Sequence, residues 1–422
     1  MKYIYLLFLS IGLPILAYCQ IDQPSLGASY ANMNFYSLSD GATTQHDHTI
    51  WDIAFGVAPQ DLSVFVNEGV GLAMGPPLPE VELYITKSTD YANADTTGMI
   101  RIYNNELSWE AGAFNHVSSP SDPFDQGWGT YNPATHQVTG SRVFCIKLRS
   151  GSYKFLQIQS LISGVYTFQF KDLDGSNELT KTITKSNYTG KNLAYYSFDS
   201  DSAMDLEPAQ WDLLFTRYYT PLNAGMGDTV NYMVTGVLIN RGMQVARVTG
   251  IDPMTVNYMD YEDEYVDTLA IIGHDWKSFN LSTFQWSIPS DRVYFVKTTT
   301  DSLWKVQFLD FEGSSTGTST LERTFETELT AIGTPIPQVS FFKLFPNPSA
   351  GMVNVSFEFQ TVSKKAHLRL VNQLGQSIYS STLEVRPGPT THRLDLTDLA
   401  SGMYHLSLQV ENRVVSQPLV IK

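Results

Sequence analysis

The chain has 422 residues, of which 43% are apolar and 16% are charged, and its formal net charge is −15. At roughly 100–200 residues per domain, this length predicts two to four domains, and the composition excludes a disordered chain or a small disulfide-stapled scaffold. The acidic balance excludes a basic surface of the kind that binds phosphate backbones, so we expect no nucleic-acid partner.

The N-terminus has the three parts of a secretory signal peptide. Lys2 precedes an apolar run over residues 4–17, which small and helix-breaking residues interrupt, and a small-residue cleavage pattern ends at Cys19. The run is too short and too interrupted for a transmembrane span, and no other segment reaches that length. We therefore predict a signal peptide over 1–19 and export from the cytoplasm. A lipidated Cys19 is disfavoured because a bulky residue precedes it.

Several stretches of the chain align with later stretches in the same order. The longest pair reads NMNFYSLSDGATTQHDHTIWDIAF at 32–55 and NLAYYSFDSDSAMDLEPAQWDLLF at 192–215. Shorter matches follow, at 128–132 with 276–280 and at 142–147 with 292–297. Their order predicts two tandem copies of one unit, a first repeat over 20–187 and a second repeat over 188–328.

Each repeat is predicted to be all-β. Trp51, Ile53 and Phe55 alternate with other residues, which predicts a strand with three large side chains on one face, and the second repeat shows the same pattern. Runs rich in β-branched and aromatic residues recur between turn-forming clusters, at 81–86, 153–159, 165–170 and 293–298. We expect an all-β fold of two tandem antiparallel β-sandwich-like units plus a small C-terminal β-sandwich.

A proline-containing connector over 329–340 precedes a domain over 341–422. Its motifs are FPNP at 345–348, LVNQLGQ at 370–376 and LDLTDLASGMY at 394–404. In this order they resemble the type A C-terminal sorting domain of the type IX secretion system, a small β-sandwich that directs a periplasmic protein across the outer membrane. The resemblance implies the type IX secretion machinery as a partner and an extracellular or surface-attached destination.

The sorting motif comprises residues that fit strand edges and turns. The prolines fit the sheet edge where the first strand begins, and Gly375 and Gly402 fit hairpin turns. The motif residues are Pro346, Asn347, Pro348, Gly351, Gly375, Gly402 and Tyr404.

The repeated unit resembles a second family. An aromatic-Tyr-Ser strand, a Trp-Asp-x-x-Phe motif, an aromatic turn motif and an alternating strand that ends in Lys are together similar to the HmuY family. The second repeat carries the pattern most fully, with QWDLLFTRYY at 210–219 and HDWKSF at 274–279. The family contains secreted or surface-anchored all-β proteins, and its founding member is a haemophore. The matching residues are chiefly core and turn positions, so the resemblance implies the fold more directly than haem binding.

Haem binding requires His or Met side chains beside a flat apolar slot. The candidate haem ligands are His136, His116 and His274. His136 aligns with Phe284 of the second repeat and His274 with Gln126 of the first, so the shared fold requires neither histidine. Each can equally be a solvated loop histidine.

Two further segments contain metal-binding residue types. His46-Asp47-His48 offers two imidazoles, but they point the same way only within a continuing strand, and no further ligand is near in sequence. In 172–178 the glycine comes too early for an EF-hand loop, and a tight turn at Asp174-Gly175 explains the residues. We predict no metal site.

Sequence signatures of enzymes are missing. There is no Gly-x-Ser-x-Gly elbow, zinc-protease motif or phosphate-binding loop, and signal cleavage leaves only Cys145, in a strand-like run that predicts a buried thiol. We therefore predict a non-enzymatic, secreted, cell-surface ligand-binding protein, with haem as the candidate cofactor. The alternatives are a surface adhesin or envelope protein that binds a glycan or a protein, and a surface hydrolase with two facing carboxylates.

Overall fold

The computed structural model describes residues 19–70, 79–225, 227–328, 339–359, 365–372, 377–383, 386–410 and 413–422. All but the last residue of the predicted signal peptide lies outside the described residues, as do Gly375 and most of the predicted connector. The chain divides into two compact units, Met1–Glu326 and Thr327–Lys422. The described helices are all short 3-10 turns: η1 (Ala28–Tyr30), η2 (His48–Ile50), η3 (Lys185–Tyr188), η4 (Tyr258–Glu264) and η5 (Gly313–Ser315).

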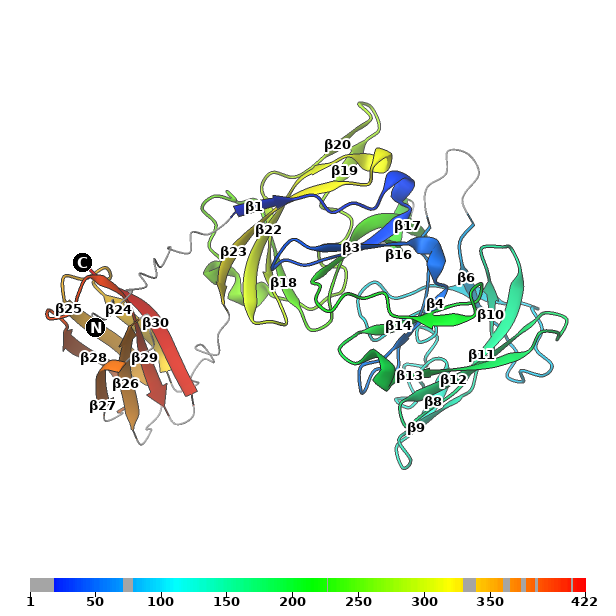
Figure 1. Cartoon of the computed structure of the whole chain (residues 1–422), viewed down its shortest axis with the longest axis horizontal. Helices are drawn as coiled ribbons and strands as arrows, with labels where there is room; N and C mark the ends of the chain where they lie inside the picture. Colours follow the sequence, from blue (N-terminus) through cyan, green and yellow to red (C-terminus); the bar gives the residue numbers. More distant parts are fainter. Residues whose placement is uncertain are drawn as a thin grey trace, which may run out of the picture. The chain divides into compact units, whose positions relative to one another are not determined.

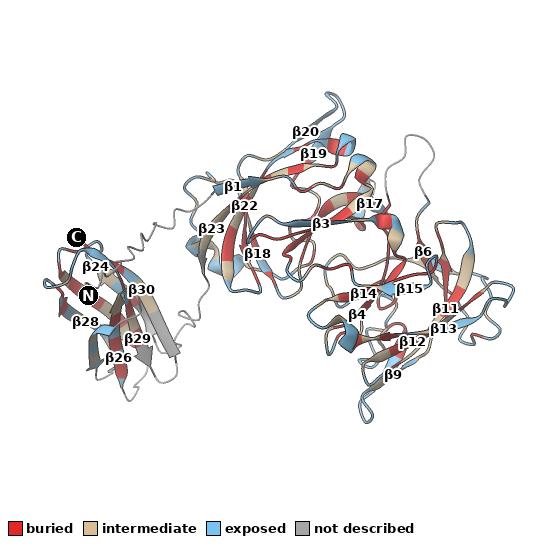
Figure 2. Ribbon diagram, in the orientation of Figure 1, coloured by how far each residue is buried: buried red, intermediate tan, exposed pale blue. Residues whose placement is uncertain are grey.

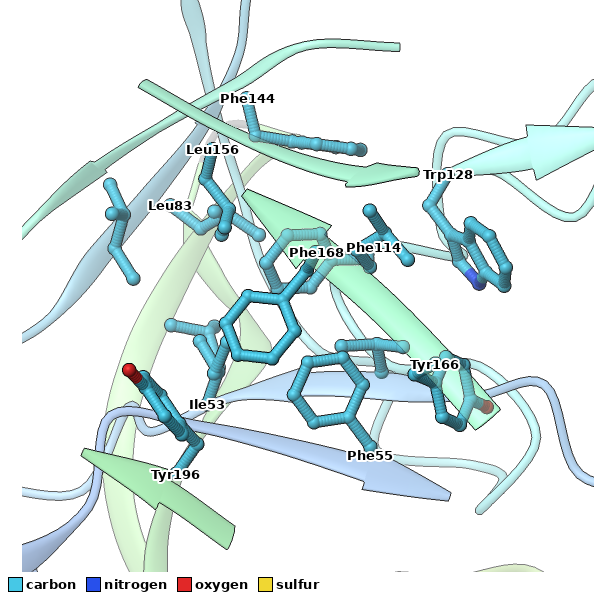
Figure 3. Close-up of a cluster of buried hydrophobic side chains, with 14 of the residues drawn as sticks. Ile53, Phe55, Leu83, Phe114, Trp128, Phe144, Leu156, Tyr166, Phe168 and Tyr196 are labelled. Carbon is cyan, nitrogen blue, oxygen red and sulfur yellow. The ribbon is translucent and has the colours of Figure 1, made fainter. Parts of the chain in front are cut away.

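The first unit contains two lobes, each built from two packed sheets. The outer sheet of the first lobe has the order β13-β12-β11-β10-β6-β7, with β8 and β9 attached through β11. Its strands are β6 (Glu82–Ile85), β7 (Ile100–Ile102), β8 (Gly129–Asn132), β9 (Gln137–Gly140), β10 (Phe144–Lys147), β11 (Tyr153–Ile162), β12 (Val165–Asp172) and β13 (Leu179–Thr184). The inner sheet has the order β15-β14-β4-β5. Its strands are β4 (Ile53–Gly56), β5 (Val64–Val66), β14 (Leu193–Ser197) and β15 (Ser202–Met204). Aromatic side chains such as Phe55, Phe168 and Tyr196 fill the space between these sheets (Figure 3).

The second lobe has the same two-sheet arrangement. Its outer sheet has the order β1-β23-β22-β21-β18 and its inner sheet the order β17-β16-β2-β3. The outer strands are β1 (Cys19–Asp22), β18 (Gln244–Thr249), β21 (Arg292–Lys297), β22 (Ser302–Phe311) and β23 (Ser319–Glu328). The inner strands are β2 (Asn32–Tyr36), β3 (Thr43–Asp47), β16 (Leu213–Gly225) and β17 (Asp228–Ile239), and a separate hairpin is formed by β19 (Ser278–Asn280) and β20 (Gln285–Ser287). Tyr36, Phe215 and Trp276 belong to the core of this lobe.

The N-terminal segment closes the second lobe. β1 pairs with β23, and β2 pairs with β16, so that Tyr36 lies opposite Leu213. In Figure 1 the blue strands β1 and β3 accordingly lie among green and yellow strands. In the first lobe the equivalent place is taken by the β14–β15 hairpin, which pairs with β4. Each core therefore uses strands from both sides of the predicted repeat boundary at 187/188.

The two inner sheets pack against each other, so that β4, β5 and β14 are buried on both faces. In β14, Ala194 and Tyr196 face the first-lobe core, whereas Leu193 and Tyr195 join a cluster shared with the second lobe. Burial on both faces explains why these strands are almost continuously apolar rather than alternating. Figure 2 shows the buried residues concentrated along the strands and the exposed residues in the loops.

Trp51 does not share a face with Ile53 and Phe55, which corrects the prediction for this segment. β4 begins only at Ile53, so its two-residue alternation does not extend back to Trp51. Ile53 and Phe55 enter the first-lobe core, but Trp51 packs edge-on against Tyr195 between the lobes, with ring centroids 5.0 Å apart. The second lobe shows the same difference from the prediction, because Trp211 likewise belongs to the cluster between the lobes.

The second unit is a small β-sandwich, as the sequence predicted. A three-stranded sheet, β24-β25-β28, packs on a four-stranded sheet, β27-β26-β29-β30. The strands are β24 (Val339–Phe345), β25 (Met352–Phe359), β26 (Ala366–Asn372), β27 (Ser377–Leu383), β28 (Gly388–Asp395), β29 (Gly402–Val410) and β30 (Arg413–Ile421). Apolar residues from both sheets, including Val355, Leu368 and Leu408, form its core.

The sorting motif is tied to strand ends of this sandwich. Pro346 and Pro348 follow the edge strand β24 rather than preceding the first strand. Asn347 attaches the motif to β30, because its Nδ2 donates to the carbonyl of Pro418 at 2.7 Å and its Oδ1 accepts from the N–H of Val420 at 2.9 Å. The motif therefore fixes the connection between β24 and β25.

The later motif residues are also structural. Gly351 has φ of 107°, and a Cβ atom there would lie 2.7 Å from the Cα of Thr397, so only glycine fits. Gly402 begins β29 opposite Ile421 and is not in a hairpin turn, which corrects the prediction. The Tyr404 hydroxyl donates to the carbonyl of Ala400 at 2.9 Å.

Candidate functional site

An open groove of about 600 Å³ lies at the end of the first lobe, where two hairpin turns meet. His136 belongs to the β8–β9 turn, and Ser163 and Gly164 belong to the β11–β12 turn. Apolar side chains make up much of the lining, namely Pro59, Leu62, Pro123, Phe124, Val138 and Leu161. The groove therefore presents one imidazole beside an apolar surface.

The His136 ring is oriented by a neighbouring tyrosine. Its Nδ1 lies 2.7 Å from the hydroxyl of Tyr131, which also lines the groove, and this contact leaves Nε2 available. Lys185 lines the groove as well, and its Nζ donates to the carbonyls of Ala58 and Asp61. Burial lowers the pKa of Lys185 to about 8, so most of this amine remains charged at neutral pH.

The other two candidate histidines do not line this groove. His116 is exposed, and its Nδ1 lies 3.1 Å from the carbonyl of Tyr103. His274 is half-buried in the second lobe, where burial lowers its pKa despite the opposing effect of Asp275. The structure therefore does not bring the predicted haem ligands together.

His46 and His48 also diverge. Nε2 of His46 lies 2.8 Å from the carbonyl of Leu206, whereas His48 is fully buried and neither of its ring nitrogens has a hydrogen-bond partner. Burial, with Arg217 and Arg149 nearby, lowers the pKa of His48 to about 3 and keeps the ring neutral. No group of three or more His, Cys, Asp or Glu suited to a metal ion occurs among the described residues. Cys145 is buried, and this burial raises the pKa of its thiol to about 11.

The aspartates of the two Trp-Asp motifs form matching contacts just beyond the ends of strands. Asp52 Oδ2 accepts from the N–H of Phe198, and Asp212 Oδ2 accepts from the N–H of Leu38, each at 2.7 Å. Neither contact was predicted, because each joins residues at least 146 positions apart. Asp52 and Asp212 are 4% and 9% exposed, so each carboxylate has lost most of its hydration.

Of these two aspartates, only Asp52 has a cationic partner among the described residues. Arg149 Nη1 lies 3.2 Å from Asp52 Oδ1, and the same guanidinium donates to the carbonyls of His48, Trp51 and Gly69 at 3.0–3.3 Å. Burial still raises the pKa of Asp52 and lowers that of Arg149, so desolvation outweighs their attraction. The Arg149 side chain therefore completes a filled guanidinium site in the first lobe.

Asp212 instead lines a polar cleft of about 570 Å³ in the first unit. No described residue forms an ion pair with it, and burial raises its pKa to about 6. Trp211, Asn240, Thr299 and Trp304 also line this cleft. Glu207 lines it too, but its carboxylate already accepts from the backbone N–H groups of Asn192 and Leu193 at 2.8 and 3.0 Å.

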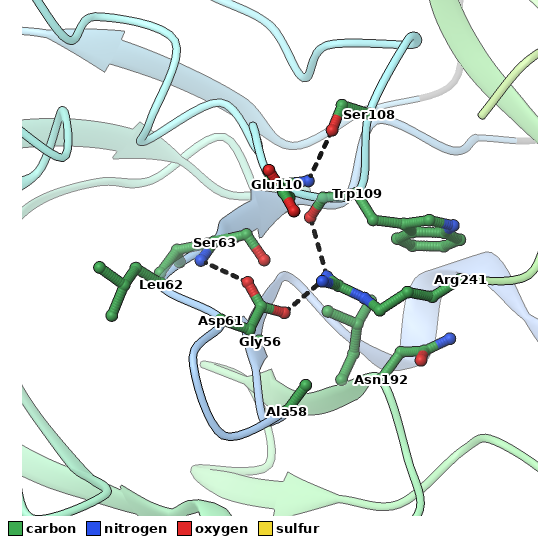
Figure 4. A network of polar contacts seen from close by, with 12 residues as sticks. Gly56, Ala58, Asp61, Leu62, Ser63, Ser108, Trp109, Glu110, Asn192 and Arg241 are labelled. Carbon is green, nitrogen blue, oxygen red and sulfur yellow. Dashed lines mark hydrogen bonds and ion pairs between the residues drawn. The ribbon is translucent and has the colours of Figure 1, made fainter. Parts of the chain in front are cut away.

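An ion pair between the buried Asp61 and the partly exposed Arg241, which itself lines this cleft, joins the two lobes. Arg241 Nη2 lies 2.6 Å from Asp61 Oδ2 and donates to the carbonyl of Trp109 at 3.1 Å, while Asp61 Oδ1 accepts from the N–H of Ser63 (Figure 4). The Arg241 guanidinium is thus directed at the first lobe and does not neutralise Asp212.

A smaller cavity of about 90 Å³ lies between the inner sheets, lined in part by Trp51, Trp109 and Tyr218. Glu68 is also in its lining, and burial raises the pKa of this carboxyl to about 7. Benzene fills a cavity of about 150 Å³, so this space is far too small for haem.

The sheets of the first unit and the C-terminal sandwich define an all-β protein. Residues 343–422 match the family described as a secretion system C-terminal sorting domain, and residues 189–325 match the family described as HmuY protein. The sorting domain supports export to the cell surface or the extracellular space and implies interaction with the type IX secretion machinery. No helix among the described residues has the length and apolar character needed to cross a bilayer. A search of curated proteins gave no match.

Three solved structures show distant similarity. Apo PinO from Porphyromonas gingivitis is 9% identical, covers 74% of this chain and 100% of its own, and has a TM-score of 0.24. Dimeric latent PorU from Porphyromonas gingivalis is 9% identical over 86% of this chain and 36% of its own, with a TM-score of 0.17. The BSP domain of a biofilm associated protein is 9% identical over 96% and 81%, with a TM-score of 0.18. Scores this low establish no shared fold.

Proposed function

We propose that the protein is a secreted or surface-displayed binding protein that would hold haem in the first-lobe groove, with His136 as a ligand to its iron. The observation that carries this proposal is the position of a partly free imidazole beside an apolar groove of about 600 Å³. Neutral imidazole is a common ligand of haem iron, and bound haem would supply iron-centred chemistry or serve as cargo.

The groove residues fit the group in three respects. Phe124, Val138 and Leu161 offer an apolar surface to a macrocycle, and Tyr131 holds Nδ1 of His136 so that Nε2 is the nitrogen left for iron. The ammonium of Lys185 adds positive charge beside the apolar lining, although the residue is 7% exposed and its Nζ donates to the carbonyls of Ala58 and Asp61. Because His116 and His274 lie outside the groove lining, we expect one strong protein ligand rather than two.

Two tandem copies of one unit form part of the same proposal. The reciprocal contacts of Asp52 and Asp212 support it, as do the aligned turn residues His136 and Phe284, which have φ of 55° and 53°. The N–H groups of these turn residues donate to Asn132 and Asn280 at the same distance, 2.8 Å. The repeats therefore differ in ligand-binding side chains more than in backbone.

Haem titration of the purified exported protein tests the assignment. We expect a saturable Soret shift at one haem per chain, which His136→Ala abolishes and which the matched variant His116→Ala leaves unchanged. Saturable binding that survives His136→Ala would overturn the ligand assignment. A featureless titration of the wild-type protein would overturn haem binding itself.

A surface adhesin or envelope protein that binds a glycan or a protein is the alternative if haem fails. Trp51 and Trp211 are 9% and 6% exposed, so neither would form such a contact surface. The hydrolase alternative receives less support, because the Glu207 carboxylate beside Asp212 is occupied by backbone donors. Residues Asp212 and Glu207 therefore do not form a free acid/base pair.

A further inference from the structure

The sites around Asp52 and Asp212 have similar backbone arrangements, but only the site of Asp52 is occupied by an arginine of the chain, Arg149. We propose that the second-lobe cleft binds the guanidinium group of an arginine side chain, with Asp212 as its counter-ion. This site lies in another lobe from the His136 groove, and it involves a different ligand. The inference therefore does not depend on haem binding.

The backbone acceptors around Arg149 have counterparts beside Asp212. Asn67 Nδ2 donates to the carbonyl of Trp51 at 2.7 Å, and Asn240 Nδ2 donates to that of Trp211 at the same distance. The N–H groups of these asparagines donate to the carbonyls of Asp52 and Asp212 at 2.8 and 2.9 Å. In the first lobe, Arg149 donates to a tryptophan carbonyl and an aspartate carboxylate. The same two groups of Trp211 and Asp212 are held in a matching arrangement in the second lobe.

One further acceptor follows from the same alignment. His48, whose carbonyl accepts from Arg149, aligns with Pro208, and Pro208 lines the cleft. A guanidinium in the cleft would therefore meet a carboxylate and backbone carbonyls, as Arg149 does in the first lobe.

Threonine replaces the internal arginine in the second lobe. The turn after β10 is closed by the N–H of Leu148 and the carbonyl of Ser152, and the turn after β21 by the N–H of Thr298 and the carbonyl of Ser302, each at 2.9 Å. The residue after the first donor is Arg149 in one turn and Thr299 in the other. Thr299 lines the cleft, and its side chain is too short to reproduce the contacts of a guanidinium.

The charges around the cleft favour a cation. The carboxylate of Asp212, a residue 91% buried, accepts one backbone N–H and forms no ion pair with any described residue. Asp40 adds negative charge nearby. Two arginines approach the cleft but are engaged elsewhere. Arg241 lines it, yet its guanidinium pairs with Asp61, and Arg323 pairs with Asp22 and lies over the ring of Trp304.

A guanidinium fits this arrangement better than an ammonium group. Its planar fork can donate to a carboxylate and to several carbonyls at once, as Arg149 does, whereas lysine offers a compact point charge. Trp211 and Trp304 also line the cleft, but they are only 6% and 7% exposed, and the Arg323 guanidinium already lies 5.4 Å from the centroid of the Trp304 ring. The volume of about 570 Å³ also leaves room for the rest of an arginine residue.

Isothermal titration calorimetry of the exported protein with L-arginine, L-citrulline and L-lysine tests the proposal. Citrulline has nearly the shape of arginine without its charge. We expect saturable binding of arginine, with citrulline at least tenfold weaker and lysine intermediate. A Gly-Gly-Arg-Gly-Gly peptide distinguishes the sources: tighter binding than free arginine indicates a peptide ligand, and weaker binding indicates the free amino acid.

Three variants locate the site. Asp212→Asn keeps the size of the side chain and should weaken arginine at least tenfold, and Thr299→Arg should abolish binding by refilling the cleft as Arg149 fills the first-lobe site. Asp267→Asn, at an exposed second-lobe aspartate outside the cleft lining, is the matched control and should bind arginine normally. Thermal unfolding of each variant identifies any that fails to fold.

Equal affinity for arginine and citrulline would overturn the proposal, as would full arginine binding by folded Asp212→Asn or Thr299→Arg. Should one of these variants not fold, the other and the citrulline comparison decide. His136→Ala should leave arginine binding unchanged, so failure of haem binding and failure of this site give different results.

Discussion

The two lobes enclose a buried aspartate in nearly the same backbone frame, yet only the first lobe neutralises it. Asp52 has Arg149 at 3.2 Å, whereas Asp212 faces a cleft with no ion-pair partner among the described residues. Burying an unpaired carboxylate is unfavourable, and the pKa of about 6 for Asp212 reflects that. The first lobe thus keeps a structural ion pair, while under our proposal the second keeps a binding group at a cost in stability.

The lobes also differ in how they close, and this difference gives the largest expected effect. Deleting residues 20–47 removes most of β1 and all of β2 and β3, which exposes one edge of β16 and of β23. We expect the second lobe to lose slow amide hydrogen exchange while β11 and β12 of the first lobe retain it. Hydrogen exchange with mass spectrometry reads both lobes in one experiment. Simultaneous loss in both lobes would instead show that they fold as one cooperative unit.

Arg149→Thr converts the first-lobe site into the form of the second. It leaves Asp52 buried without its cation and removes donors from three backbone carbonyls. Removing one partner of a buried pair costs about 3–5 kcal/mol, and we expect a loss of that size in chemical unfolding of the full chain. The matched variant Asp52→Asn/Arg149→Thr should recover part of the loss, because no charge is then left unpaired. A loss below about 1 kcal/mol in the free energy of unfolding of Arg149→Thr would show that buried Asp52 does not need its cation.

The all-β architecture and the C-terminal sandwich were predictable because strand alternation and turn residues are local signals. Closure of the second lobe was not, since pairing of Tyr36 with Leu213 joins strands far apart in sequence. Strand alternation also misplaced Trp51, because the pattern does not show that β4 begins at Ile53.

The candidate sites show the same division between local and distant signals. His136 was predicted as a ligand, but its groove depends on loops brought together by the fold. The Asp212 cleft was missed, although one signal was present: extending the alignment of 142–147 with 292–297 by two residues places Arg149 opposite Thr299. The replacement of Arg149 by Thr299 could be interpreted only once the structure showed that Arg149 pairs with the carboxylate of Asp52.

The pH dependence of stability should reveal the unpaired carboxylate of Asp212. Burial raises its pKa from 3.8 to about 6, so the folded state holds this proton more tightly than the unfolded state. Its contribution is therefore full below about pH 4 and is lost as the pH rises through 6, by about 2–4 kcal/mol at 1.36 kcal/mol per pKa unit.

Comparing wild type with Asp212→Asn isolates this contribution from that of Glu68, whose pKa is also raised. The variant should lose stability less steeply between pH 4 and 7 and should be the more stable protein at pH 8. Urea unfolding across this range provides the measurement. Parallel pH profiles for the two proteins would contradict an uncompensated carboxylate at this position.

Removing one partner of an exposed ion pair in the first lobe should cause the smallest loss of stability. This control separates the effect of an ion pair alone from the effect of its burial. Lys181 Nζ lies 2.5 Å from Asp201 Oδ2, closer than Arg149 lies to Asp52, but the two side chains are 28% and 44% exposed. Water and salt screen such a pair, so Lys181→Ala should cost only about 0–1 kcal/mol in the same unfolding assay. If Lys181→Ala cost as much as Arg149→Thr, distance rather than burial would govern these pairs. The contrast between Asp52 and Asp212 would then lose its physical basis, because the raised pKa of Asp212 and its cost in stability both depend on burial.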